Sequence, residues 1–423
     1  MHVYRVVCAL AAMMAPLAAA QKAVQPKDVR ELAKGGSGAI PRMTEMLRDP
    51  NPEVRAEVVR QLTDIGTGRS LDPLIQATSD RDVRVEMLAT DGLVNFYLPG
   101  YVKNGLSGTL RLVGNSLKAK FTDTNDQLID PYITPRAEVI AALGKVVVGG
   151  ASTDAQANAA RALGILRGRD AVPQLVEAAH SKDTDVIYES IVALQKIRDA
   201  SAGPRISFRL RDLDPKVQVA AVEAMGLLLN RDAIQDLIDL LNDSRDDRVR
   251  RAALTSLAML PGERNRAIYT RFLNDKDERM RGAAAEGFGR LRQPGDVPML
   301  EKALKNEGKP LTRLSLCFAL VLDGRTEGGQ FSPLTFLVNN LNSAMYKGAA
   351  FPLLVELARE ANVRKALYPP LVAGLKEEKI ALAGVMARSG DKDSLAPLRQ
   401  LASDPDPAVS QEAVRAATLL EAR

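Results

Sequence analysis

The chain has 423 residues, of which 46% are hydrophobic and 26% are charged, so it is long enough to bury a large core. Lysine and arginine exceed aspartate and glutamate by five, a modest excess that does not by itself demand a nucleic-acid partner. Two histidines and two cysteines exclude multi-histidine metal centres and a dense disulfide framework.

Residues 1–20 have the three-part pattern of a secretory signal peptide. Arg5 supplies a basic start, residues 6–15 are apolar, and Ala18 to Ala20 supply the small residues that a signal peptidase needs. The apolar run is too short to span a bilayer. We therefore expect export to the periplasm or the medium with cleavage after Ala20, rather than a frayed apolar terminus. The processed chain would keep one histidine and one cysteine, so it would fold without an internal disulfide.

Residues 21–38 precede a repeating pattern and are predicted to form an N-terminal capping helix. From residue 39 onward, similar phrases recur, such as DPNPEVRAEVVRQL from residue 49 and DLDPKVQVAAVEAMG from residue 212. Their first hydrophobic residues are separated by steps near 31, the signature of a stacked repeat. These anchors are Val54, Val83, Ala155, Val186, Val217, Val249, Met280, Thr312, Lys379 and Val409.

Each anchor belongs to a predicted α-helix, because apolar residues follow it at +4, +5, +7 and +8. An N-cap residue stands three positions earlier, often followed by a proline that loses no hydrogen bond in the first turn. A shorter helix precedes each of these helices, and in several repeats it has a proline ten to fourteen residues before the anchor, as at Pro173 and Pro397. The predicted N-caps are Asn51, Asp80, Ser152, Asp183, Asp214, Asp246, Asp277 and Asp406.

This unit of two helices resembles a HEAT repeat, in the short bacterial form that is also seen in phycobilin lyases. The resemblance implies an all-α solenoid of about eleven stacked helix-turn-helix units with one continuous core. Residues 39–97 would form repeats 1 and 2, and residues 136–423 would form repeats 3 to 11. By resemblance, the second helix of each repeat lines the concave surface.

Residues 98–135 interrupt the repeats. Leu106, Leu110, Val113 and Leu117 have helical spacing, which predicts an amphipathic helix. One hypothesis is that this helix covers adjacent repeats, with tyrosines such as Tyr97 and Tyr101 filling gaps. The other is that the insertion binds a partner, because insertions in solenoids often do so. Residues 123–130 match a calcium loop too poorly to predict a metal site.

The arginines fall into two predicted sets according to their position on the second helix. Those at +1 should reach acidic turns of adjacent repeats and form the arginine–aspartate ladder that the HEAT resemblance implies. Those at −1, +2, +3, +6 and +10 should point away from the core, into the groove. The ladder set is Arg55, Arg84, Arg250, Arg281 and Arg313. The predicted partner-binding set is Tyr188, Arg248, Arg251, Arg279, Arg290, Leu314 and Phe318, with Tyr97 just before the insertion and Tyr101 within it.

No catalytic, cofactor-binding or metal-binding residue is predicted. Cys317 occupies a core position and His180 a surface position, and the sequence contains no nucleophile, phosphate-binding or zinc motif. We expect a non-enzymatic binding protein with a protein or peptide partner, an acidic one in particular. The alternatives are a lyase or isomerase that acts on a small ligand, and a HEAT-like nucleic-acid-binding protein. The absence of tryptophan and the expected export both argue against the last.

Overall fold

A computed structural model describes residues 24–104, 127–130 and 132–422 of the chain. In these ranges α-helices and short 3-10 turns follow one another without a strand, which confirms the predicted all-α class. No helix in the same ranges is both long and apolar enough to cross a membrane. Helix α1 (Pro26–Ala33) lies within the predicted capping segment, and α6 (Tyr101–Asn104) begins the insertion.

The remaining helices form pairs, each made of an outer helix and an inner helix that packs on it. The outer helices are α2 (Ile40–Met46), α4 (Leu71–Ala77), α8 (Ala137–Gly149), α10 (Val172–Ala178), α12 (Ala202–Ile206), α14 (Ile234–Asp243), α16 (Arg266–Phe272), α18 (Val297–Asn306), α20 (Pro333–Asn339), α22 (Ala361–Ala366) with α23 (Tyr368–Ala373), and α25 (Leu395–Leu401).

The inner helices each contain one sequence anchor, except α21, which contains none. They are α3 (Pro52–Ile65), α5 (Val83–Tyr97), α9 (Thr153–Ile165), α11 (Thr184–Ile197), α13 (Pro215–Leu227), α15 (Asp247–Met259), α17 (Glu278–Leu291), α19 (Pro310–Leu322), α21 (Lys347–Leu357), α24 (Lys376–Ser389) and α26 (Pro407–Glu421). This series confirms the predicted solenoid of about eleven units.

Paired acidic residues order the turn before many inner helices. In the turn before α13, Asp212 accepts a hydrogen bond from the Asp214 N–H, and Asp214 caps the helix. The same arrangement precedes α5, where Asp82 accepts from the amides of the first turn. The prediction that Asp80 is the N-cap was therefore wrong. Asp80 accepts from the Asp82 N–H instead, because it is the first of the two acids.

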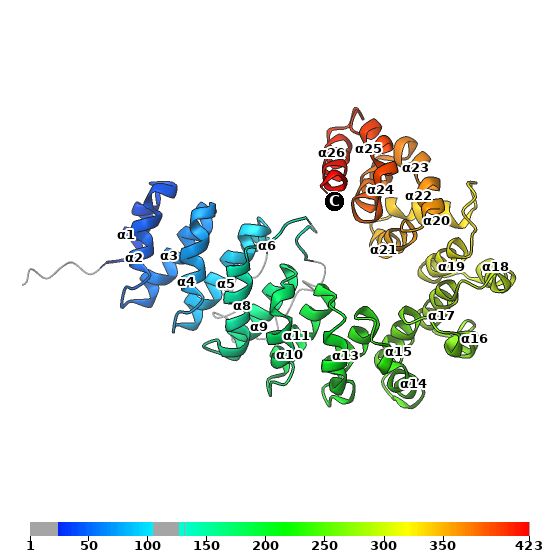
Figure 1. Cartoon of the computed structure of the whole chain (residues 1–423), viewed down its shortest axis with the longest axis horizontal. Coiled ribbons are helices and arrows are strands. Elements are labelled where there is room, and N and C mark those ends of the chain that lie inside the picture. The colour runs from blue at the N-terminus through cyan, green and yellow to red at the C-terminus, as the bar shows by residue number, and fades with distance from the viewer. Residues whose placement is uncertain (1–23, 105–126, 131, 423) are drawn as a thin grey trace, which may run out of the picture.

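Small residues let consecutive inner helices approach closely. A Cβ on Gly226 of α13 would lie 2.7 Å from the Ser256 Cα of α15, and one on Gly289 of α17 would lie 2.5 Å from the Ala319 Cα of α19. Only glycine fits at such backbone contacts. Close packing of the inner helices curves the solenoid around them, so they form its concave side (Figure 1).

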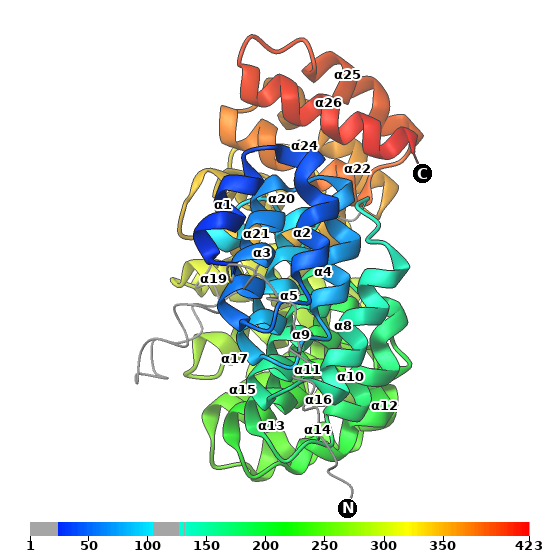
Figure 2. The ribbon, with the colours of Figure 1, turned by 90° about the vertical axis from the view of Figure 1, so that its left-hand side faces the viewer.

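The curve turns back on itself. In Figure 1 the chain descends from α1 to α13 and rises through α19, and α21 to α26 then lie across the open side from α9 and α11. The view turned by 90° places α25 and α26 at one edge and α13 and α14 at the opposite edge (Figure 2). Inner helices far apart in sequence therefore face a common space.

Two hydrophobic cores run through the solenoid, so the prediction of one continuous core was wrong. The first core extends from Val29 to Leu320, and the second from Leu314 to Ala417. Helix α19 contributes to both. A long turn, residues 323–332, follows this helix and begins with Gly324 at φ 100°. Helices α20 and α21 pack on the side of α19 that belongs to the second core.

Candidate binding surface on the inner helices

Salt bridges join the C-terminal repeats to distant parts of the chain. Arg290 of α17 contacts Glu356 of α21 with two hydrogen bonds of 2.8 Å. Nearby, Arg292 Nη2 lies 2.7 Å from Glu360 Oε1. At the end of the solenoid, Arg415 Nη1 of α26 lies 2.7 Å from Asp130 Oδ2, 285 residues earlier. These contacts hold the two sides of the concave space in register.

Arg290 was predicted to be a free groove residue, and the structure contradicts this. Besides Glu356, it pairs with Glu286 at 3.1 Å and lies over the Phe318 ring at 4.9 Å. Burial lowers the pKa of Arg290. The hydrogen bond to Glu356 and the charge of Glu286 raise it by a larger amount, so the net shift is upward. Arg290 faces the concave side as predicted, but its guanidinium is bound by Glu356 of the C-terminal repeats.

Phe318 and Leu314 were also predicted to face the groove, and both predictions were wrong. Their exposed fractions are 0% and 1%. Both side chains belong to the second hydrophobic core. The reason is the position of α19 at the junction of the two cores, where α17 covers one side and α20 and α21 cover the other.

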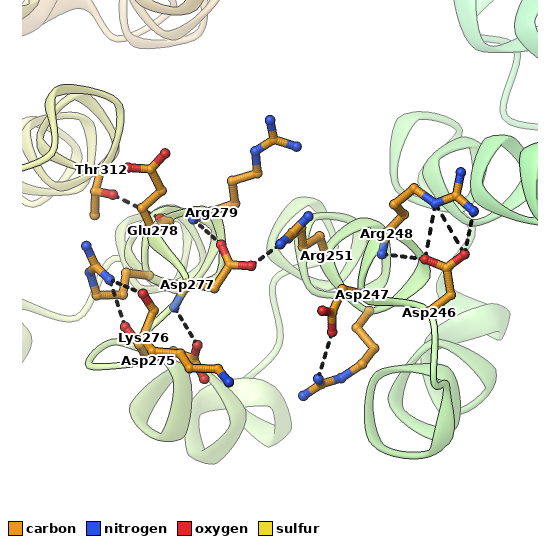
Figure 3. Close-up of polar contacts among 12 residues, drawn as sticks. Asp246, Asp247, Arg248, Arg251, Asp275, Lys276, Asp277, Glu278, Arg279 and Thr312 are labelled. Atoms are coloured by element: carbon orange, nitrogen blue, oxygen red, sulfur yellow. Dashed lines mark hydrogen bonds and ion pairs between the residues drawn. The ribbon is translucent and has the colours of Figure 1, made fainter.

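The starts of α15 and α17 carry three of the predicted groove arginines. Figure 3 shows Arg248 and Arg279 on the side of these helices opposite the turn of Asp275 and Lys276. Arg248 is exposed and contacts its own N-cap, Asp246, at 2.7 Å. Arg279 is exposed, and its guanidinium has no hydrogen bond or salt bridge among the described residues. Arg251 differs, because its Nε lies 2.6 Å from Asp277 Oδ2 of the next repeat.

Arg55 and Arg281 make the contacts expected of the ladder. Arg55 donates to Asp80 in the next turn at 2.7 and 2.8 Å, and to the Asp49 carbonyl of its own turn at 2.8 Å. Arg281 repeats this with Glu307 and the Asp275 carbonyl. Each guanidinium thereby joins two consecutive repeats.

The other three ladder predictions differ from the structure. Arg84 contacts Glu53 on the preceding inner helix rather than a turn, and both side chains are solvent-accessible. Arg250 stays within its own repeat, where it donates to the Leu241 carbonyl at the end of α14 and to Asp247. Arg313 also stays in its own repeat, on the Leu304 and Glu307 carbonyls. Carbonyls near the end of an outer helix attract these cations because the helix dipole is negative there.

The sequence analysis missed a buried polar network between α5, α9 and α11. Arg161 donates to Glu189 at 2.5 and 3.1 Å, and Asn158 donates to Asp91 at 3.0 Å. All four residues have exposed fractions of 4% or less. The sequence could have predicted this ion pair, because Arg161 and Glu189 lie about one repeat apart, at positions that face adjacent inner helices. Burial makes this ion pair sensitive to the loss of either partner.

The described ends of the insertion pack against the repeats. The Tyr97 hydroxyl accepts a hydrogen bond from the Arg136 N–H, and Tyr101 is half-buried against the first core. Ile129 is buried, and its N–H donates to the Ile165 carbonyl at the end of α9. Tyr188 is half-buried under the Lys216 ammonium, 3.8 Å from its ring centre. The predicted helix from Leu106 to Leu117 lies outside the described residues, as does residue 123 of the calcium-loop comparison.

His180 and Cys317 have ordinary structural surroundings. The exposed His180 ring stacks on Phe208 at 4.3 Å. Cys317 is buried in the second core, and burial raises the pKa of its thiol to about 12 although Arg313 opposes the shift. The described ranges contain no group of three histidine, cysteine or acidic side chains placed to hold a metal.

Several solved structures are similar to this chain at low sequence identity. The CpcE–CpcF complex of phycocyanin lyase from Nostoc sp. PCC7120 is 18% identical, with 62% of this chain and 90% of that chain covered and a TM-score of 0.38. Human deoxyhypusine hydroxylase is 19% identical, with 68% and 97% covered and a TM-score of 0.28. A structure from work on cadherin and beta-catenin is 13% identical, with 94% and 97% covered and a TM-score of 0.39.

No curated protein sequence matches this chain significantly. The model of HEAT repeats, by contrast, matches residues 14–102, 140–207 and 204–270, just over half of the sequence. The matched segments include the inner helices α3, α5, α9, α11, α13 and α15. The chain therefore belongs to the HEAT-repeat family.

Proposed function

We propose that this protein is an exported, non-enzymatic scaffold that binds a protein partner along its concave inner-helix surface. HEAT repeats stack into long surfaces on which many modest contacts add up. The observation that carries the proposal is the row of arginines at the starts of α15 and α17. Arg248 and Arg279 come from consecutive repeats, lie on the same side of the stack and are exposed. Exposed cations in a row favour a partner with acidic side chains.

Position-specific photo-cross-linking tests this function. A photoreactive residue at Arg279 or at Glu223 would sample the inner surface, since Glu223 on α13 stands at the same repeat position as Glu286 on α17. Lys302, exposed on outer helix α18, is the matched control. We expect a cross-linked protein partner from the inner positions and none from Lys302. Equal cross-linking from the outer helix, or none from the inner positions, would contradict the proposal.

Export rests on the pattern of residues 1–20 and is tested separately. The intact mass of the native protein should correspond to a chain that begins at Gln21. A product of full length retained in the cytosol would contradict this part of the proposal.

A further inference from the structure

The last repeat meets the end of the insertion across the open side of the curve. Arg415 Nη1 on α26 lies 2.7 Å from Asp130 Oδ2, although the two residues are 285 positions apart in the sequence. The Tyr132 hydroxyl donates to the same Asp130 oxygen at 3.1 Å. Figure 1 shows α26 returning toward the segment that follows α6. The contact between Asp130 and Arg415 therefore closes the curve.

Each member of this pair is held by its own part of the chain. Next to Asp130, the side chain of Ile129 is buried in the first core, and its N–H donates to the Ile165 carbonyl at 3.1 Å. On the other side, α26 belongs to the second core. Glu412 on the same helix orients Arg415 through hydrogen bonds of 2.8 and 2.7 Å. The pair thus joins two bodies that are each built separately.

The contact has no hydrophobic core behind it. Among the described residues, the first core has no buried member after Leu320, and the second has none before Leu314. A cavity of about 210 Å³ lies between Asp130 and Tyr132 on one side and helices α24 and α26 on the other. The side chains of Arg415 and Asp130 are 34% and 33% exposed. A salt bridge with this exposure stabilises weakly and is screened by salt.

The other long-range salt bridges have a different place in the stack. Arg290–Glu356 and Arg292–Glu360 join repeats two units apart, on either side of α19, so they act on the local curvature there. The Asp130–Arg415 pair instead joins the two ends of the curve. Each repeat of a solenoid contacts mainly its neighbours. Small rotations spread over the stack can therefore separate these ends without unfolding a repeat.

We propose that Asp130 and Arg415 form a clasp that closes the solenoid around its inner surface, and that its opening admits an extended protein segment. A closed curve admits such a segment only end-on, whereas an open one admits it from the side. Because one exposed ion pair separates the two forms, ionic strength shifts the balance between them. The opening is a property of this chain alone, and only the admission of a partner rests on the proposed function.

Single-molecule energy transfer between two dyes measures the opening directly. Ala141→Cys on α8 and Ser403→Cys in the turn before α26 place the dyes at exposed positions on the two sides of the clasp. In the chain that begins at Gln21, the remaining cysteine is Cys317, which is buried and should stay unlabelled. We expect a short and a long distance population. The long one should grow as the salt concentration rises.

A charge reversal tests the role of the pair. Asp130→Lys places a cation against Arg415 and should shift the ratio of closed to open forms about tenfold toward the open form. Adding Arg415→Glu to this variant restores opposite charges and should restore the closed population. Glu53→Lys is the matched control, since its pair with Arg84 has a similar exposure but joins consecutive repeats far from the clasp. The control should leave the ratio unchanged.

A milder variant and a measurement without dyes support the same test. Arg415→Gln removes the cation without adding a like charge, and it should shift the ratio about threefold toward the open form. Small-angle X-ray scattering of unlabelled chains should give a larger radius of gyration for Asp130→Lys than for the parent chain. Together they keep the test decisive if the labelled Asp130→Lys chain does not fold.

The inference is overturned if Asp130→Lys and the parent chain give the same populations, if salt leaves these unchanged, or if the charge-swapped chain stays open. The cross-linking experiment at Arg279 and Glu223 is read independently. A partner captured there, together with unchanged distances in Asp130→Lys, would remove the clasp and leave the proposed function intact. Opening of Asp130→Lys without any captured partner would support the clasp and contradict the proposed function.

Discussion

Arg55 Nε lies 2.7 Å from Asp80 Oδ2, and the same guanidinium donates to the carbonyls of Asp49 and Pro50. One side chain thus joins the turns of two consecutive repeats, and its exposed fraction is 4%. The hydrogen bond to Asp80 raises the pKa of Arg55, so the cation is firmly held. Such contacts explain why a stack of short helices keeps its register.

Arg55→Ala should lower the free energy of unfolding by about 3 kcal/mol, because it leaves Asp80 and two turn carbonyls without their partner. Arg84→Ala is the control, since its salt bridge with Glu53 is partly exposed and should contribute about 0 to 1 kcal/mol. Chemical denaturation of both variants measures the difference. Equal losses would show that burial does not strengthen the Arg55 contact.

Arg161→Ala should cost about 3 kcal/mol by leaving the Glu189 carboxylate buried without its ion-pair partner. Replacing both residues by leucine should recover much of this loss, because no charge then remains buried. A thermodynamic cycle of the two single variants and the double variant measures the coupling. A double variant less stable than either single variant would mean that the ion pair, rather than the burial of a lone charge, holds α9 against α11.

The contacts of α15 reverse the predicted roles of two neighbouring arginines. Arg251→Ala should lower the melting temperature more than Arg250→Ala, since Arg251 contacts the next repeat and Arg250 only its own. The loss for Arg251→Ala should be about 1 kcal/mol, as expected for a partly exposed pair. Thermal melts of the two variants check the order, and the opposite order would restore the sequence-based assignment.

Asp323→Asn should stabilise the protein at neutral pH. Burial, with the nearby charge of Asp296, raises the pKa of Asp323 to about 6, and neither carboxylate oxygen has a hydrogen-bond partner among the described residues. The folded state therefore binds a proton more tightly than the unfolded state, whose value is 3.8. The ionised group is destabilising above about pH 6, and this penalty disappears as the pH falls toward the unfolded value.

After allowance for solvent screening, the gain for Asp323→Asn at neutral pH should be about 1 kcal/mol. Denaturation of the variant and the parent chain across this pH window measures it. A gain that persists unchanged at acidic pH would show that ionisation of Asp323 is not its cause.

Cys317 should not react with a water-soluble disulfide reagent at about pH 8 in the folded protein, because its thiol is buried and its pKa is about 12. The thiol should react fully in denaturant. Reactivity can thus report opening of the second core, and fast labelling of the native protein would contradict the burial of α19.

The sequence determined the repeat and its local geometry. The acids at Asp183, Asp214 and Asp277 and the prolines that start some inner helices, such as Pro215, act over a few residues. Together with the step near 31, they predict helices and caps without knowledge of distant contacts. The contact of Arg55 with the next turn also followed, since that turn is fixed by the neighbouring repeat.

The contacts between distant repeats were decided only by the tertiary structure. They depend on how small rotations between consecutive repeats accumulate. Close approach at Gly226 and Gly289 and the long turn after α19 bring the C-terminal repeats back across the concave space. That return buries Phe318, pairs Arg290 with Glu356, and pairs Arg415 with Asp130. These partners lie tens to hundreds of residues apart. No periodicity encodes them, because the curvature that joins them is a property of the whole stack.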